Sequence, residues 1–309
     1  MFYGANGHWD YNHTIDQQIE ALRMMGMEPG YYRVAWEGPH TMDYLVNLAT
    51  ALRETGIDMI CCINLSMVNE RGELYASEGE AYHAGWMAGA KVAAALAPLG
   101  VTIFQTGNEL DAKEGIRVDQ RMQGGVPEDF RNSHFPSLRG VINGCAQAVR
   151  TVGGPHVQIA SNCFTACSIA CSDMLWDGMQ PDGSGGHPKL RWDITTWNNY
   201  QCYGSMLDMS LDYMKPRVNL LDHCKSKYGV PIIVTEWNGN EGDTDDQRTE
   251  WAKQFMDEIY WSGRELYGVE ALVVYQLICG DPWGVINYDM SLQHNFGRTV
   301  RDFIMTHPA

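Results

Sequence analysis

The hydrophobic positions of the chain recur in one arrangement from end to end. A short run of apolar or β-branched residues is followed by polar or aromatic residues, and then by a segment with helical spacing. This alternation predicts repeated strand–helix units and a parallel sheet. The predicted strands span residues 2–8, 31–37, 57–65, 101–107, 157–162, 192–199, 230–235 and 269–276.

The helical segments carry local start and stop signals. Thr14 and Gln17 have the spacing of a capping box, and the apolar face of the helix that follows ends at Gly26. Residues 296–305 can supply a final helix. Eight units with no linker between them predict an α/β fold, a single-domain (β/α)8 TIM barrel over residues 1–309. An open doubly wound sheet is the alternative, but no glycine-rich phosphate motif follows the first strand.

Composition and charge narrow the classes of function. Against 38 Asp and Glu stand 22 Lys and Arg, which gives a net charge of −16 and a pI near 4.9. Such a charge repels phosphate backbones, so nucleic acid is not an expected partner. No stretch approaches the roughly 20 apolar residues of a membrane span. We therefore expect a soluble protein. Its compartment stays open, and a secreted or periplasmic protein whose signal has been removed is one possibility. Its oligomeric state also stays open.

The cysteines are expected to be structural. Nine in 309 residues are too few for a disulfide scaffold and odd in number, so we predict mostly free, buried thiols. Cys163, Cys167 and Cys171 recur every four residues, which suggests either a metal site or one helical face of apolar thiols. Their spacing matches neither paired zinc motifs nor iron–sulfur motifs, so we expect no metal and no other cofactor.

In a closed barrel, functional residues lie at the carboxyl ends of the strands and in the loops that follow. Those positions are polar and aromatic in this chain. Amides that bind hydroxyls, indoles that stack on sugar rings and carboxylates that transfer protons are suited to carbohydrate chemistry. The strand-end residues of this kind are Asn6, His8, Trp9, Trp36, Glu37, Asn64, Asn108, Glu109, Asp111, Asn162, Trp197, Asn198, Asn199, Tyr200, Glu236, Trp237, Asn238, Tyr275 and Gln276.

Glu109 and Glu236 end the fourth and seventh predicted strands. Strands three apart in an eight-stranded barrel are separated by about 14 Å at Cα, and two glutamates that each reach inward by about 4 Å bring their carboxyl groups to about 5 to 6 Å. This estimate is close to the separation of about 5 to 5.5 Å in retaining glycosidases and shorter than in inverting ones. The pair therefore predicts a retaining mechanism.

These residues give the chain a resemblance to glycoside hydrolase clan A, the superfamily of retaining (β/α)8 glycosidases. Asn108-Glu109 on the fourth strand and Glu236 on the seventh carry it, and it extends over the whole chain. Within the clan the chain looks most like small bacterial family 39-type, cellulase-like enzymes, with family 5 as the neighbouring possibility. The segments most similar to them are residues 4–8, 32–34, 107–110 and 235–238.

The resemblance implies a retaining hydrolase that cleaves a β-type bond in an oligo- or polysaccharide by double displacement. It makes Glu109 the acid/base and Glu236 the nucleophile. The positions that match the clan's supporting residues are Asn108, which binds the sugar 2-hydroxyl, Arg33, which holds the nucleophile ionised, and Tyr200, which donates to it. Asn198 stands where the clan pattern has a histidine, which leaves its contact with sugar or acid/base open.

Other strand-end residues are candidates for substrate binding, with packing or structural roles as the alternative for each. They are His8, Trp9, Trp36, Asn162, Trp237, Gln276 and Trp283, and Trp283 follows the last predicted strand. The rim loop from Asp111 to His134 is expected to decide whether the cleft is open. The alternative function is a non-catalytic carbohydrate-binding barrel, a pseudo-glycosidase. This alternative stays open because Asn198 stands where the clan pattern has a histidine. Sugar, linkage and endo or exo action do not follow from the sequence.

Overall fold

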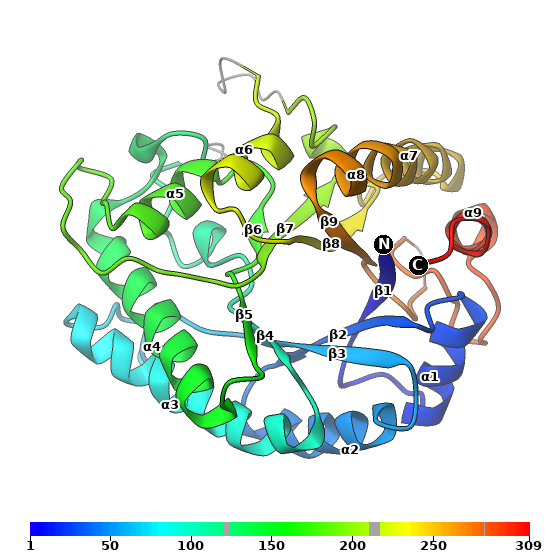
Figure 1. Cartoon of the computed structure of the whole chain (residues 1–309), viewed down its shortest axis with the longest axis horizontal. Coiled ribbons are helices and arrows are strands. Elements are labelled where there is room, and N and C mark those ends of the chain that lie inside the picture. Colours follow the sequence, from blue (N-terminus) through cyan, green and yellow to red (C-terminus); the bar gives the residue numbers. More distant parts are fainter. Residues whose placement is uncertain (120–123, 210–216, 281) are drawn as a thin grey trace.

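The computed structural model describes residues 1–119, 124–209, 217–280 and 282–309. Its strands form one sheet in the order β5-β4-β3-β2-β1-β9-β8-β7-β6, and neighbouring strands run parallel. The sheet curls so that helices lie outside it (Figure 1). The strands are β1 (Phe2–Gly7), β2 (Gly30–Trp36), β3 (Ile57–Ile63), β4 (Ile103–Thr106), β5 (Gln158–Ala160), β6 (Phe164–Thr165), β7 (Thr195–Tyr200), β8 (Ile232–Asn238) and β9 (Val269–Val274).

The predicted (β/α)8 barrel is confirmed, and its fifth strand is split. β5 pairs with β4 and β6 pairs with β7, while a parallel bridge from Ala160 to Ile194 closes the sheet. In the gap between β5 and β6, side-chain hydrogen bonds to neighbouring segments take the place of backbone strand pairing. The Ser161 hydroxyl accepts from the Thr196 amide at 2.9 Å, and the Asn162 side-chain oxygen accepts from the Leu110 amide at 3.3 Å. Such side-chain bonds compete with regular strand pairing.

The helices follow the predicted order. The capping box is present at the start of α1, where the Thr14 hydroxyl accepts from the Gln17 amide and the Gln17 side chain accepts from the Thr14 amide. Within the described ranges, no helix is long and apolar enough to cross a membrane. The α-helices are α1 (Ile15–Met24), α2 (Met42–Leu52), α3 (Glu78–Leu96), α4 (Phe135–Gly153), α5 (Ile169–Asp177), α6 (Leu220–Lys227), α7 (Asp245–Glu258), α8 (Arg264–Tyr267) and α9 (His294–Thr306).

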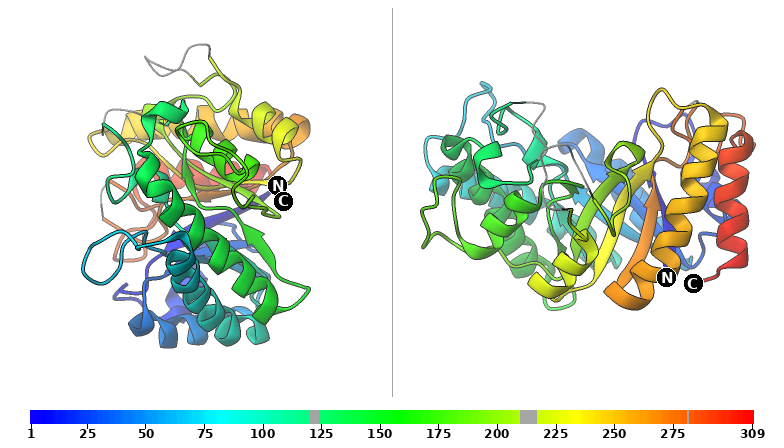
Figure 2. Two further views of the ribbon diagram at one scale, coloured as in Figure 1. Left: turned by 90° about the vertical axis from the view of Figure 1, so that its left-hand side faces the viewer. Right: turned by 90° about the horizontal axis from the view of Figure 1, so that it is seen from above.

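The outer layer is packed unevenly around the barrel. α7 and α9 lie side by side (Figure 2). α3 and α4 approach much more closely, backbone to backbone. A Cβ added at Gly85 would lie 2.0 Å from the Val141 carbonyl oxygen, and one at Gly144 would lie 2.0 Å from that of Tyr82. Glycine is therefore required at both positions, and this tight pair covers the side of the barrel that contains β4.

The barrel interior changes from apolar to polar along the strands. Side chains two positions apart on a strand point to the same face, so Tyr31 and Arg33 of β2 both point inward. Tyr31 packs against an apolar cluster, whereas Arg33 joins a hydrogen-bonded layer nearer the carboxyl ends. The apolar cluster comprises Ile60, Ile103, Ala160, Ile194, Ile233, Ala271 and Val273. It closes the barrel beneath the polar layer.

All nine cysteines are free, and seven of them are buried. The predicted helical face of three thiols is wrong. Cys163 precedes β6, Cys167 follows it and Cys171 lies in α5, because residues 164–165 are extended and pair with β7. In the described part of the chain, no cluster of three His, Cys, Asp or Glu side chains is arranged to hold a metal ion.

Candidate active site

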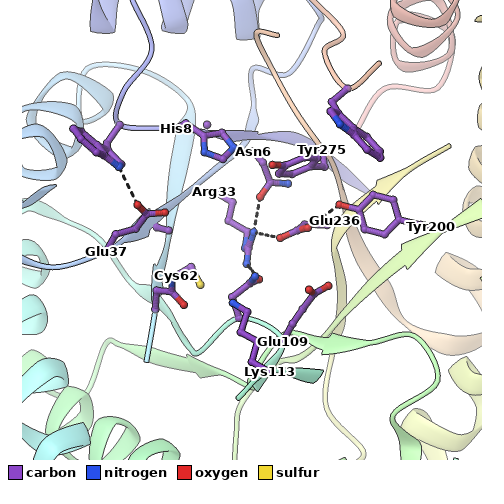
Figure 3. A pocket seen from close by; sticks show the side chains of 16 residues that line it. Asn6, His8, Arg33, Glu37, Cys62, Glu109, Lys113, Tyr200, Glu236 and Tyr275 are labelled. Atoms are coloured by element: carbon purple, nitrogen blue, oxygen red, sulfur yellow. Dashed lines mark hydrogen bonds and ion pairs between the residues drawn. The ribbon is translucent and has the colours of Figure 1, made fainter. Parts of the chain in front are cut away.

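A cavity of about 430 Å³ opens at the carboxyl ends of the strands (Figure 3). Both predicted catalytic glutamates line it, and they come from opposite parts of the barrel, after β4 and within β8. The lining residues are Asn6, Gly7, His8, Trp9, Arg33, Ala35, Glu37, Cys62, Asn64, Asn108, Glu109, Lys113, Tyr200, Glu236, Tyr275 and Trp283.

Glu236 is held by two donors at the floor of the cavity. The Arg33 guanidinium forms an ion pair with it at 2.7 Å, and the Tyr200 hydroxyl donates to its other oxygen at 2.9 Å. Burial beside this carboxylate raises the pKa of Tyr200 well above its usual value, so the hydroxyl keeps its proton. Arg33 also donates to side-chain oxygens of Asn6, Gln105 and Asn108, at 2.5, 2.7 and 2.7 Å.

Glu109 has a different environment. Its backbone is left-handed, with φ of 52°, and its amide donates to the Cys163 carbonyl at 2.8 Å. Burial and the nearby negative charge of Glu236 raise the pKa of Glu109 to about 7, although a hydrogen bond of 2.9 Å donated by Asn198 acts in the opposite direction. This carboxyl group can therefore hold a proton near neutral pH.

Asn198 lies behind Glu109 and does not line the cavity. A register shift between Trp197 and Asn198 pairs Asn198 with Glu236 of the neighbouring strand, which re-aims its side chain as β-bulges do. The amide nitrogen donates to Glu109, while the amide oxygen accepts from the Cys163 thiol and from the Thr235 hydroxyl. Its contact is therefore with the acid/base candidate.

Asp111, another strand-end carboxylate, is a structural anchor. It is fully buried and forms an ion pair with Arg117 at 3.2 Å. Asn162, predicted to bind substrate, instead supports this turn from below and is absent from the cavity lining. The side chains that donate to Asp111 besides Arg117 are those of Asn162, Thr165 and Ser168.

The predicted aromatic residues divide between cavity and core. Trp9 and Trp283 line the cavity, and the Trp9 indole donates to Glu37 at 3.0 Å. Trp237 is 2% exposed and packs against aromatic rings between barrel and helices, because strand alternation points it away from the interior. Trp36, which packs against the core, also lies outside the lining. Trp197, a further candidate for stacking on a sugar ring, is fully buried in the core.

His8 and Gln276 are the two remaining predicted contacts. His8 lines the cavity, and burial lowers its pKa, so the imidazole is neutral at neutral pH. Among the described residues its Nε2 is buried and has no hydrogen-bond partner, as suits an atom that binds a ligand hydroxyl. Gln276 is outside the lining and accepts from the Tyr11 hydroxyl at 2.9 Å.

Several lining residues had no individual role assigned from the sequence. Asn6, Glu37, Asn64 and Tyr275 stand at strand ends that the sequence marked as polar or aromatic, so their position was the available signal. Tyr275 forms a wall with Tyr200 and Trp283, at ring distances of 6.4 and 6.1 Å. Cys62 lies within an apolar run and Lys113 within a loop, where no pattern points to a site. The rim loop itself is described except for residues 120–123, which lie outside the described ranges.

Comparisons with known proteins bear on the fold. No protein-family model and no curated protein matches the sequence. Solved structures do match. An AHE enzyme from Alicyclobacillus herbarius has 12% sequence identity and a TM-score of 0.69, and the match covers 99% of this chain and 97% of that one. A β-glucosidase from Exiguobacterium marinum has 16% identity and a TM-score of 0.66, with 95% and 87% covered, and a family 1 β-glucosidase from Thermotoga maritima has 12% identity and a TM-score of 0.63, with 99% and 97% covered. The chain shares the (β/α)8 fold of these structures, as the clan-level resemblance implied. Membership of family 39 or family 5 stays a prediction.

Proposed function

We propose that the chain is a retaining β-glycosidase with Glu236 as nucleophile and Glu109 as acid/base. The observation that carries the proposal is the contrast between two carboxyl groups in one cavity. Glu236 is ion-paired with Arg33, whereas the pKa of Glu109 is raised to about 7. A pair of carboxyl groups in such unlike environments is what an acid and a nucleophile require. The fold shared with β-glucosidases supports a sugar substrate.

The proposed reaction has two displacements. Glu236 attacks the anomeric carbon while Glu109 gives its proton to the departing oxygen, which forms a glycosyl-enzyme ester. Esterification removes the negative charge of Glu236, and that charge contributes to the raised pKa of Glu109. Glu109 then becomes more acidic and can take a proton from the water that attacks the ester. One residue thus serves as acid first and as base afterwards.

The hydrogen-bond donors of the floor orient the sugar. The Asn108 side-chain oxygen accepts from Arg33, so its amide nitrogen remains available to donate to the sugar 2-hydroxyl. His8 offers its unpartnered Nε2 to a further hydroxyl. Trp9 and Trp283, both in the lining, present indole faces that complement the C–H face of a pyranose. We therefore expect an oligo- or polysaccharide with a β-linked sugar in this cavity.

Replacement of Glu236 by Ala is the decisive test. Glu236→Ala should abolish hydrolysis and should regain turnover with azide and an activated aryl glycoside, because azide fits the space left by the carboxylate. The azide product should have the inverted anomeric configuration, which NMR measures. Glu265→Ala, on the exposed surface of α8, is the matched control and should keep full activity.

Two outcomes would contradict the proposal. Near-normal hydrolysis of the natural substrate by Glu109→Ala or Glu236→Ala would remove the assigned roles. Binding of oligosaccharides without cleavage by the unmodified protein, measured by calorimetry beside product analysis, would instead indicate a pseudo-glycosidase. Screening aryl glycosides and polysaccharides identifies the sugar.

A further inference from the structure

The turn that follows Glu109 is bounded by two left-handed residues. Glu109 has φ of 52° and Glu114 has φ of 53°, and neither is a glycine. Such conformations are strained for residues other than glycine and persist where the surroundings impose them, often at ligand-binding sites. Residues 110–113 between them form a tight turn at the edge of the cavity.

Both ends of this turn are fixed by buried or paired carboxylates. Asp111 is fully buried in its network with Arg117. Glu114 reaches across to the segment after β3, where its two oxygens accept from the Ser66 hydroxyl at 2.7 Å and from the Met67 amide at 2.6 Å. Lys113 lies between these anchors and lines the cavity beside Glu109 (Figure 3). The anchored backbone on both sides therefore fixes where the Lys113 side chain enters the cavity.

The Lys113 ammonium group has no hydrogen bond or ion pair with any of the described residues. Among the other charged lining groups, Arg33 and Glu236 are paired with each other, and Glu37 accepts from the Trp9 indole. Glu109, beside Lys113, has a pKa raised to about 7. Lys113 is therefore a lining cation with no ion-pair partner among the described residues, beside a carboxyl group that can hold a proton. Since the Debye length is about 8 Å at physiological ionic strength, this nearby charge outweighs the distant surface charges for a group bound in the cavity.

We propose that Lys113 makes the cavity selective for glycosides that carry a carboxylate next to the scissile bond. The inference rests on the proposed glycosidase function. Glu109 protonates the glycosidic oxygen, and Lys113 lies close enough for its charge to act on Glu109. An anion within reach of Lys113 therefore belongs to one of the two units that this oxygen joins. The carboxylate is either that of a uronate in the glycone or one on the leaving group.

Paired substrates separate the two sources. One pair is a nitrophenyl hexuronide and the nitrophenyl hexoside of the same configuration. The other pair is that hexoside with and without a carboxylate on the nitrophenyl ring. The measured quantity is the ratio of kcat/KM for the charged and the neutral member, because any effect of Lys113 on the proton of Glu109 acts on both members and cancels.

Lys113→Met should lower this ratio about tenfold for one pair, since a charge-assisted hydrogen bond is lost, and Lys113→Arg should restore most of it. The pair that responds tells which unit carries the carboxylate. Lys91→Met is the matched control, because it removes one positive charge from the exposed surface of α3 and should leave both ratios unchanged.

An unchanged ratio for both pairs in Lys113→Met would overturn the selectivity while leaving the glycosidase proposal intact. A wild-type protein that cleaves none of these substrates nor any glycoside in the wider screen would overturn the proposed function itself. A larger effect in Lys91→Met than in Lys113→Met would assign the selectivity to overall charge and would also overturn the inference.

Discussion

The two glutamates of the cavity are positioned by different kinds of backbone structure. Glu236 lies within β8, a seven-residue strand whose residues are all buried, and its neighbours in register belong to β7. Glu109 follows β4, a four-residue strand, in a left-handed conformation, and its amide is bonded to the break between β5 and β6. Regular sheet thus positions one carboxyl group, and irregular backbone positions the other.

This difference matches the chemistry proposed for each group. A nucleophile needs a fixed position and a fixed charge, and a strand with an arginine and a tyrosine beside it provides both. An acid/base exchanges a proton twice in each cycle, so its environment has to balance burial against hydrogen bonding. For Glu109 that balance involves Asn198, which comes from a bulge, and Cys163, which comes from a strand break. The following variants separate the two supports.

The largest effect is expected at the support of Glu236. Arg33→Met removes the buried ion pair and the donors to three further side chains, so we expect a loss of about 3 to 5 kcal/mol in the free energy of unfolding and a drop of more than about 1000-fold in kcat/KM. Urea denaturation and kinetics measure the two losses. Arg53→Met, at an exposed position after α2, is the control. A stable and active Arg33→Met variant would show that the strand alone positions the nucleophile.

A smaller effect concerns the stability cost of Glu109. Its pKa is raised to about 7 in the folded protein from the usual 4.5 of a glutamate, so between these pH values the folded state binds more protons than the unfolded state. The stability of the wild type therefore falls as pH rises through this window, by at most about 3 kcal/mol. Glu109→Gln lacks this titration, and its stability relative to the wild type should rise from pH 4 to pH 8. Urea denaturation at both pH values tests this, and a constant difference would contradict it.

The smallest effect is expected at Cys163. The Cys163 thiol donates to the Asn198 amide oxygen and so orients the amide that donates to Glu109. Because that hydrogen bond lowers the pKa of Glu109, Cys163→Ala should move the basic limb of the kcat/KM profile to higher pH, by about half a unit.

Cys145→Ala is the matched control for Cys163→Ala, since it also removes a fully buried thiol, but within α4. Both variants should lose similar stability in urea, and only Cys163→Ala should shift the pH profile. Equal profiles would assign Cys163 a packing role alone.

The fold was predictable because the signals for its strands and helices lie in consecutive residues of the sequence. The capping box at Thr14 and the apolar run of β3 are properties of consecutive residues, and the structure has both elements. The split of the fifth strand was not predictable. It depends on the side chains of Ser161 and Asn162, which accept from the amides of Thr196 in β7 and of Leu110 in the turn after β4. Such partners are known only once the barrel is closed.

The site was predictable to the extent that its residues stand at strand ends. Glu109 and Glu236 line one cavity because parallel strands end at one rim. Trp237 has the same kind of position but points outward, and a shift of one residue along a strand changes the face. Lys113 faces the cavity through a tertiary contact of its neighbour Glu114, which the sequence does not reveal.

The split fifth strand is also the part of the barrel wall with the fewest backbone pairings. β2 and β3 are in register over seven residues, whereas β5 and β6 span three and two and are joined to their surroundings partly by single bridges. Amide hydrogens along this break should therefore exchange sooner than those of β2 and β3, because fewer paired neighbours protect them. Since the Cys163 carbonyl accepts from the Glu109 amide, local opening at this break would also displace the proposed proton donor.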